Sequence, residues 1–245
     1  MLGLENDETK KEKWEVSYQN EDNFLFYPNE EIIRFFSKYV KKRMGITNYT
    51  NMSNVDNDLK VLDLGCGIGR HVFYVNEMGL DVFGIDLSVN AINFCKKWAI
   101  SKGLKGLEDK FVQGDITKLP WKENFFNIVI SHGVLDSMGF NIAVKAVKEV
   151  YRTLDEGGLF YCDLISGDDS WHSREFAGEE IIAGKHEEGT IQSYFNYNKI
   201  ISLFKNRFKI EELVLIKKEN VLRKECNARY HLVMKKISEP LYKGN

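Results

Sequence analysis

The segment DLGCGIG, residues 63–69, decides the fold of this chain. It overlaps the end of the apolar run Lys60–Leu64 (KVLDL), which predicts a short buried strand. Alternating glycines permit a tight turn and let a ligand approach the backbone closely. A helical pattern follows the turn and runs over His71, Tyr74, Val75 and Met78. The sequence therefore predicts a strand, a ligand-binding turn and a helix in succession.

Strands and helices continue to alternate downstream of this turn. Further strands are predicted at residues 81–86, 110–115, 126–132 and 159–164. The helices between them begin at an N-cap, Ser88, and near residue 141. This rhythm is typical of a parallel sheet with helices on both faces, so we expect a Rossmann-like doubly wound α/β fold.

The C-terminal part is predicted to complete the sheet. A helix is expected near residues 197–204, and two strands near residues 208–217 and 230–235. Joined across residues 219–227, these strands pair as a hairpin and form an antiparallel edge. The predicted sheet thus has seven strands and is mostly parallel.

The 245 residues are enough for one well-filled core, so we expect a single domain. We divide it into a flexible tail (1–13), an N-terminal helical cap (14–45), a ligand-binding core (60–165), an insert (166–193) and a C-terminal helix with edge strands (194–236). Residues 47–58 read as a polar loop. The insert has no periodicity, and a loop of that length is usually functional or disordered, so it is predicted to be a lid.

Composition and charge argue against several function classes. The formal net charge of −2 lacks the basic surplus of nucleic-acid-binding proteins. The four cysteines have no CxxC spacing, which leaves zinc and thioredoxin-like chemistry unsupported. The N-terminus does not read as a secretory signal, and no apolar run approaches the ~20 residues that span a bilayer. We therefore expect a cytoplasmic protein without membrane contact, and the absence of a heptad seam leaves its oligomeric state open.

Three acidic residues stand at the ends of three successive predicted strands. Asp63, two residues before the first glycine, suits a ligand with a cationic amino group. Asp86 ends the second strand, where a carboxylate accepts hydrogen bonds from both ribose hydroxyls. Asp115 ends the third, where a carboxylate accepts from an exocyclic adenine amine. Because such sheets bind ligands at the carboxyl ends of their strands, the three acids point to one site.

A nicotinamide-dependent oxidoreductase on a similar fold is the first alternative. Its glycine turn reads G-x-G-x-x-G and holds a pyrophosphate at the helix N-terminus. Here the third glycine, Gly69, comes one residue early, and Arg70 stands where that pattern has glycine. This spacing argues against an oxidoreductase, but that alternative stays open.

Five motifs in order make the chain resemble the class I S-adenosylmethionine-dependent methyltransferases. The resemblance is to the small bacterial enzymes that include the tellurite-resistance and ubiquinone-biosynthesis types. The matching stretches, from about residue 60 to 164 with weaker support to 236, are VLDLGCGIGR, VFGIDLS, FVQGDITKLPW, FNIVISHGVLDSM and EVYRTLDEGGLFYCDL. This resemblance implies S-adenosylmethionine as cofactor, S-adenosylhomocysteine as product and in-line transfer of the sulfonium methyl. A methyltransferase-like protein that binds the cofactor without turnover is the second alternative.

The resemblance also implies roles for single residues. The cofactor site it implies comprises Trp14, Tyr18, Asp63, Gly65, Cys66, Gly67, Gly69, Arg70, Asp86, Leu87, Ser88, Asp115, Ile116, Ser131, His132 and Gly133. The glycine turn lines the methionyl part, and Asp63 supports the turn and the amino group. Asp86 holds the ribose, and Asp115 reads the adenine edge. Trp14 and Tyr18 lie in a segment that often folds over the cofactor in this family.

Candidate catalytic residues follow the fourth predicted strand, next to the expected methyl group. His132 and Asp136 are candidate bases, which the reaction needs only if the acceptor must lose a proton. Many relatives carry a histidine where this chain has Ser137, so the family assigns no base here.

The acceptor is predicted to be a small molecule. The motif SHGV, residues 131–134, differs from the Asn/Asp-Pro-Pro-Tyr/Phe motif of enzymes that methylate planar nitrogens, which with the charge argues against DNA and structured RNA. The aromatic and cationic candidates for acceptor binding in the insert are Trp171, His172, Arg174 and His186. No matching ligand spacing accompanies the two histidines, so no metal site is predicted.

Overall fold

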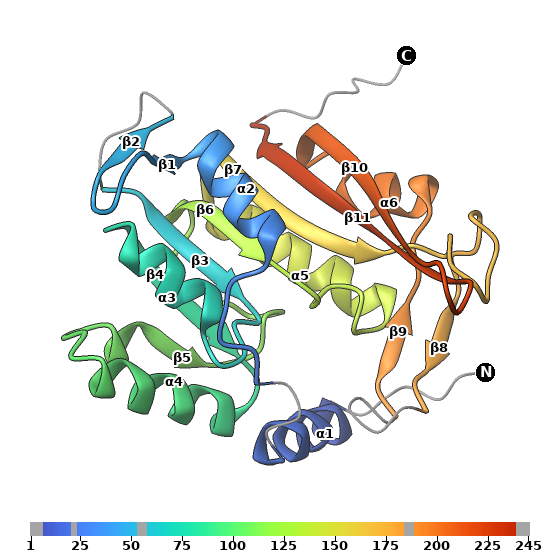
Figure 1. Ribbon diagram of the computed structural model, residues 1–245, viewed down its shortest axis with the longest axis horizontal. Helices are drawn as coiled ribbons and strands as arrows, with labels where there is room; N and C mark the ends of the chain where they lie inside the picture. Colours follow the sequence, from blue (N-terminus) through green and yellow to red (C-terminus); the bar gives the residue numbers. More distant parts are fainter. Residues whose placement is uncertain (1–6, 21–23, 53–57, 184–188, 239–245) are drawn as a thin grey trace.

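The computed structural model describes residues 7–20, 24–52, 58–183 and 189–238. Its centre is a seven-stranded sheet in the order β10-β11-β7-β6-β3-β4-β5 (Figure 1). The strands are β3 (Lys60–Leu64), β4 (Asp81–Asp86), β5 (Phe111–Gln113), β6 (Phe126–Ser131), β7 (Leu154–Ile165), β10 (Phe208–Asn220) and β11 (Glu225–Lys236). The predicted strand number and fold class are confirmed.

Five strands are parallel and the C-terminal pair forms the antiparallel edge. β3 pairs in parallel with β4 and β6, β4 with β5, and β6 with β7. β11 runs antiparallel to both β7 and β10, so the predicted hairpin is present. Its register sets His231 opposite Asp163 and Arg229 opposite Ile165. This pairing brings side chains from the end of the chain to the carboxyl end of β7.

Helices cover both faces of the sheet and divide the core into two layers. One layer contains α5 (Phe140–Thr153) and α6 (Tyr197–Phe204), and the other contains α2 (Glu30–Tyr39), α3 (Arg70–Glu77) and α4 (Val89–Ser101). Successive residues of β6 alternate between layers, with Val129 on the first and Ile128 and Ile130 on the second. A strand buried on both faces is apolar throughout, which explains why these strands could be read from the sequence.

Local signals set the helix beginnings. The Ser88 hydroxyl accepts a hydrogen bond from the amide of Ala91 at 3.1 Å, which confirms the predicted N-cap of α4. The side chain of Asn29 likewise accepts from the amide of Glu31 at the start of α2. Both caps lie on loops that lead to the ligand-binding edge of the sheet.

Three segments differ from the predictions. α1 (Asp7–Gln19) includes residues 7–13, where a flexible tail was predicted, because contacts farther along the helix hold it to the body. The predicted polar loop 47–58 contains β2 (Tyr49–Asn51), paired with β1 (Lys41–Arg43). The insert contains β8 (Glu179–Ile181), paired with β9 (Ile191–Ser193). Strands of three residues are too short to show an alternating pattern in the sequence.

Two strand boundaries also shift. β5 ends at Gln113, because Asp115 leaves the ladder and its carboxylate accepts from the amide of Thr117 at 2.8 Å. β7 begins at Leu154, directly after α5, and not at residue 159, where the predicted strand begins. Among the described residues, none of the helices has both the length and the apolar character needed to cross a membrane.

Candidate active site

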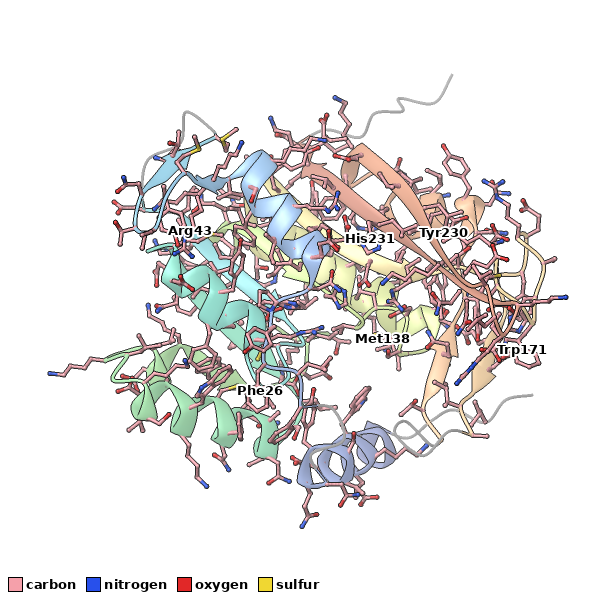
Figure 2. The ribbon with its side chains drawn as sticks, in the orientation of Figure 1. Phe26, Arg43, Met138, Trp171, Tyr230 and His231 are labelled. Atoms are coloured by element: carbon pink, nitrogen blue, oxygen red, sulfur yellow. The ribbon has the colours of Figure 1, made fainter. Side chains whose placement is uncertain are left out.

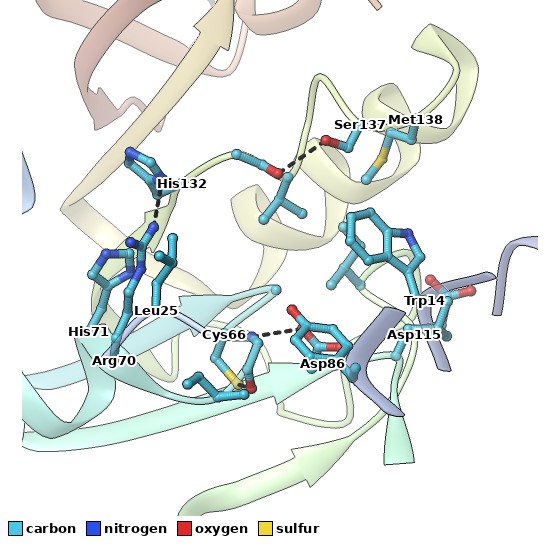
Figure 3. Close-up of a pocket in the computed structure, with 18 of the residues that line it drawn as sticks. Trp14, Leu25, Cys66, Arg70, His71, Asp86, Asp115, His132, Ser137 and Met138 are labelled. Atoms are coloured by element: carbon cyan, nitrogen blue, oxygen red, sulfur yellow. Dashed lines mark hydrogen bonds between the residues drawn. The ribbon is translucent and has the colours of Figure 1, made fainter. Parts of the chain in front are cut away.

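A cavity of about 320 Å³ lies at the carboxyl ends of the central strands (Figure 3). The predicted site residues that line it are Trp14, Tyr18, Gly65, Cys66, Gly67, Arg70, Asp86, Leu87, Asp115, Ile116, His132 and Gly133. Its wall also includes residues that sequence reasoning missed, namely Leu25, Ile68, His71, Val134, Ser137, Met138 and Ile142. All of these except His71 and Ser137 are apolar, and no chemical signal distinguishes the apolar ones in the sequence.

The glycine turn forms the floor of the cavity and accepts no larger residue. Gly67 has a φ of +53°, and a Cβ there would lie 2.6 Å from the Tyr18 hydroxyl. Gly65 has a φ of +72°, and a Cβ there would lie 2.5 Å from a methyl carbon of Val134. Both positions need the left-handed conformation and the missing side chain, so backbone atoms face the cavity.

Asp86 joins the turn to the end of β4. Its buried carboxylate accepts hydrogen bonds from the amide of Gly67 at 2.8 Å and from the amide of Ser88 at 2.9 Å. Burial raises its pKa to about 6, although the two amide donors oppose the shift. Each carboxylate oxygen keeps a lone pair, so the group can still accept from ligand hydroxyls.

A second buried carboxylate lies behind the turn. Asp63 does not line the cavity, and its Oδ2 lies 3.7 Å from His71 Nδ1 without a hydrogen-bond partner among the described residues. His71 Nε2 faces the amide of Asn29 at 3.3 Å, so Nδ1 carries the ring proton toward Asp63. A buried carboxylate oxygen without a hydrogen bond suits a cationic donor.

Some of the remaining predicted cofactor residues lie in the cavity wall, and others lie outside it. Asp115 is exposed at the rim, with Ile116 and Leu87 beside it in the cavity wall. Gly69 and Ser88 do not line the cavity and begin α3 and α4 instead. Ser131 is buried at the end of β6 outside the wall, and its hydroxyl lacks a partner among the described residues.

His132 stands at the edge of the cavity between two charged side chains. Its Nδ1 lies 3.4 Å from an Arg70 guanidinium nitrogen, and its Nε2 lies 3.5 Å from Asp163 Oδ2. Burial lowers the pKa of His132 to about 4, and Asp163 opposes the shift. The imidazole is therefore neutral at pH 7. Sequence reasoning missed Asp163, although a lone acid in the apolar run LFYCDL marks it.

The structure does not bring Asp136 to the cavity. Its buried Oδ2 accepts from the amide of Ile165 at 2.8 Å and from Arg229 at 2.6 Å. Its backbone carbonyl accepts from the amide of Ser193 at 2.7 Å. Asp136 thus anchors the loop after β6 to three other segments, and its predicted place as a base beside the methyl group does not fit this position.

The candidate acceptor residues of the insert also lie elsewhere. Trp171 is 82% exposed at the edge of the molecule, far from the cavity residue Met138 (Figure 2). His172 lies between Asp169 and Glu180, at 3.0 and 3.1 Å. Arg174 borders a separate surface depression, and His186 lies outside the described residues. The predicted lid stays a prediction, and the described residues contain no cluster of three metal-ligating side chains.

Comparison with protein families and curated proteins places the chain among methyltransferases. The family model of the methyltransferase domain matches residues 55–227. The chain is 37% identical over 111 residues to phosphoethanolamine N-methyltransferase 3 of Arabidopsis thaliana, covering 45% of this chain and 22% of that protein. It is 26% identical over 140 residues to a sterol 24-C-methyltransferase of Schizosaccharomyces pombe, covering 55% and 34%. The chain thus spans about a fifth to a third of these relatives.

Solved structures share the fold. A methyltransferase of Methanosarcina mazei described as SAM-dependent superposes with a TM-score of 0.62 at 21% identity, covering 76% of this chain and 95% of that one. The 1,6-didemethyltoxoflavin-N1-methyltransferase of Burkholderia thailandensis, solved with 1,6-didemethyltoxoflavin and S-adenosylhomocysteine, superposes with a TM-score of 0.67 at 13% identity, covering 97% and 93%. At such identities the likeness describes the fold alone.

Proposed function

Because the chain belongs to the methyltransferase-domain family, with the class I fold of S-adenosylmethionine-dependent methyltransferases, we propose that it transfers a methyl group from S-adenosylmethionine to a small-molecule acceptor. One observation carries the proposal. The buried Asp86 carboxylate is fixed by two backbone amides on the floor of the cavity, beside a turn in which Gly65 and Gly67 leave no room for a side chain. A ribose and a methionyl group fit such a floor.

The residues in and behind the cavity wall offer a suitable partner for each part of the cofactor. Asp86 is proposed to hold the ribose. Asp63, behind the turn, is proposed to attract the cationic amino group, because its buried Oδ2 lacks a hydrogen bond. Leu87 and Ile116 offer apolar surface to the adenine beside the Asp115 carboxylate. Arg70 has no carboxylate within ion-pair distance among the described residues, so it is available for the cofactor carboxylate.

The residues of this chain would act mainly by positioning. S-adenosylmethionine supplies a methyl group already activated on a sulfonium, so the protein has to orient the reactants and exclude water. Trp14 and Tyr18 of α1 line the cavity, with the Tyr18 hydroxyl close to Gly67, and we propose that they cover a bound ligand. Glu15 holds this helix in place, because its carboxylate accepts from the Ser88 hydroxyl at 2.9 Å and from the Asn90 amide at 3.1 Å.

The volume and the wall of the cavity fit a small-molecule site. The volume of about 320 Å³ lies within the range that is usual for pockets that bind small ligands. Val134, Met138 and Ile142 give part of the wall an apolar character. The names of the relatives mention phosphoethanolamine and a sterol, both of which are small molecules.

Calorimetry with S-adenosylmethionine, S-adenosylhomocysteine and NAD tests the proposal. We expect micromolar binding of the first two and none of NAD. Asp86→Ala should weaken binding at least tenfold, whereas Asp109→Asn, an exposed acid at the opposite end of β5, should leave it unchanged. Binding of NAD alone would replace the proposal with the oxidoreductase alternative. Binding of both adenosyl ligands without methyl transfer to any of a panel of amines, phenols and thiols would favour the non-enzymatic one.

A further inference from the structure

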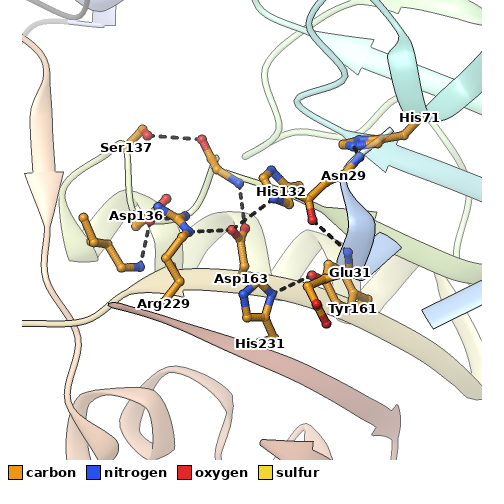
Figure 4. Close-up of polar contacts among 12 residues, drawn as sticks. Asn29, Glu31, His71, His132, Asp136, Ser137, Tyr161, Asp163, Arg229 and His231 are labelled. Carbon is orange, nitrogen blue, oxygen red and sulfur yellow. Dashed lines mark hydrogen bonds and ion pairs between the residues drawn. The ribbon is translucent and has the colours of Figure 1, made fainter. Parts of the chain in front are cut away.

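A buried carboxylate links the hairpin edge of the sheet to the cavity. Asp163 of β7 is fully buried and is not among the residues that line the cavity. It lies between His132 and Arg229 (Figure 4). Its Oδ1 accepts from the amide of Gly133 at 2.7 Å, and its Oδ2 accepts from Arg229 Nε at 2.7 Å. The same Oδ2 lies 3.5 Å from His132 Nε2. One side chain thus contacts both the loop after β6 and its histidine.

The two neighbours of His132 require the same tautomer. Arg70 only donates hydrogen bonds, so Nδ1, 3.4 Å away, must be the acceptor. Asp163 when ionised only accepts, and its Oδ2 at ion-pair distance from Nε2 favours the proton on that nitrogen. The charged and titratable groups around the ring are Arg70 and His71 from α3, Asp163 from β7 and Arg229 from β11. An unprotonated Nδ1 therefore stands at the cavity edge.

We propose that Asp163 and Arg229 are positioning residues for His132, which they hold as the acceptor of the proton that a hydroxyl or N–H substrate loses on methylation. The inference rests on the proposed function and narrows its substrate class to protic nucleophiles. Arg229 contributes by fixing Asp163, because it also binds Asp136 at 2.6 Å and so ties both carboxylates to β11.

The chemistry balances without another reactant. A lone pair of the acceptor oxygen or nitrogen forms the new bond to the methyl carbon, and the carbon–sulfur bond breaks with its electron pair staying on sulfur. The proton of the acceptor passes to His132 Nδ1 and then to solvent. Asp163 stabilises the cationic ring through Nε2–H, the arrangement that carboxylate–histidine pairs use in other enzymes. The Arg70 contact at 3.4 Å has to open first, as it would if Arg70 turned to a ligand carboxylate.

Nuclear magnetic resonance of ¹⁵N-histidine-labelled protein tests the arrangement without turnover. The chain has five histidines, and His132→Gln identifies the signal of interest. We expect the wild-type ring at pH 7 to carry its proton on Nε2. A proton on Nδ1 would overturn the proposal, because Asp163 would then face a bare nitrogen.

Two variants must then move the titration midpoint of His132 in opposite directions. Arg229→Met should raise it, because a neighbouring cation is lost, and Asp163→Asn should lower it, because the neighbouring anion is lost. Arg229→Lys should restore a midpoint near that of the wild type. Arg223→Met in the exposed hairpin turn and Asp155→Asn near the start of β7 are matched controls that should leave it unchanged. Equal midpoints in all variants would overturn the proposal.

Failure of this inference is separable from failure of the proposed function. S-adenosylhomocysteine binding is measured on the same samples, and its absence in the wild type counts against the function alone. If Arg229→Met does not fold, the other two variants still give different expectations: a midpoint near that of the wild type for Arg229→Lys and a lowered midpoint for Asp163→Asn. With an acceptor identified, Asp163→Asn should lower kcat at least tenfold while the KM for the cofactor changes less than twofold. A change in KM alone would indicate a merely structural role.

Discussion

The Asp86 carboxylate accepts a hydrogen bond from the Gly67 amide at 2.8 Å, and this contact ties the turn after β3 to the end of β4. The same carboxylate is the group proposed to hold the ribose, so its charge affects both turn geometry and ligand affinity. Because burial raises its pKa to about 6, it changes charge in a range accessible to experiment.

Cofactor affinity should therefore depend on pH through Asp86. A carboxylate accepts two ribose hydroxyls better than a carboxylic acid does, so S-adenosylhomocysteine binding should strengthen as pH rises from 5 to 7. Calorimetry should show a rise of roughly tenfold across a pKa of about 6. Asp86→Asn should bind weakly at every pH. A wild-type affinity that stays flat over this range would contradict the assignment.

The contribution of Asp86 to the stability of the ligand-free protein should fall as pH rises, whereas its contribution to cofactor binding should grow. The folded pKa of Asp86 lies above the value of about 4 expected in the unfolded chain, so the folded state binds more protons between the two. This contribution is fully present below pH 4 and is lost as pH rises through 6. Urea unfolding should show that the free energy of unfolding of Asp86→Asn, taken relative to that of the wild type, is larger at pH 7 than at pH 4.5. Equal differences at both pH values would contradict this linkage.

Gly67→Ala should abolish cofactor binding, and Gly103→Ala provides a matched control. Both glycines have positive φ, +53° and +68°, but only a Cβ at Gly67 meets a neighbour, the Tyr18 hydroxyl at 2.6 Å. Backbone strain alone costs about 1–3 kcal/mol and should appear as a lower Tm in both variants. Loss of S-adenosylhomocysteine binding should appear only in Gly67→Ala. Equal binding by the two variants would mean that the close approach at Gly67 does not matter.

The sequence predicted the parts of the site that depend on local pattern. The strands ending at Leu64 and Asp86 are short, mostly buried runs, and parallel topology alone brings their ends together. Asp163 and Arg229 meet through the register of β11 on β7, which no local pattern records. Asp136 was misplaced for a related reason. Its nearness to His132 along the chain does not fix the direction of its side chain, which a distant arginine sets.

Glu15→Ala should weaken cofactor binding without unfolding the protein. The Glu15 carboxylate accepts from the Ser88 hydroxyl and from the Asn90 amide at the N-terminus of α4, so it fastens the helix that carries Trp14 and Tyr18. Such contacts contribute about 0.5–2 kcal/mol, which corresponds to a loss of roughly 3- to 30-fold in affinity. Glu12→Ala, an exposed position on the same helix, is the control. Calorimetry checks both variants, and equal affinities would show that α1 does not contribute to binding.

Arg229→Met should be among the most destabilising single substitutions in this protein. It leaves the buried carboxylates of Asp136 and Asp163 without the cation that bonds both at 2.6 and 2.7 Å. Removing one partner of a buried ion pair typically costs about 3–5 kcal/mol, because the remaining charge stays away from water. We expect a loss of about that size in the free energy of unfolding of Arg229→Met. Adding Asp136→Asn to Arg229→Met removes one of the two stranded charges and should recover part of the loss. Urea unfolding at pH 7 measures the single and double variants. A double variant less stable than the single one would show that Asp136 contributes through its other bond, to the amide of Ile165, more than through its charge.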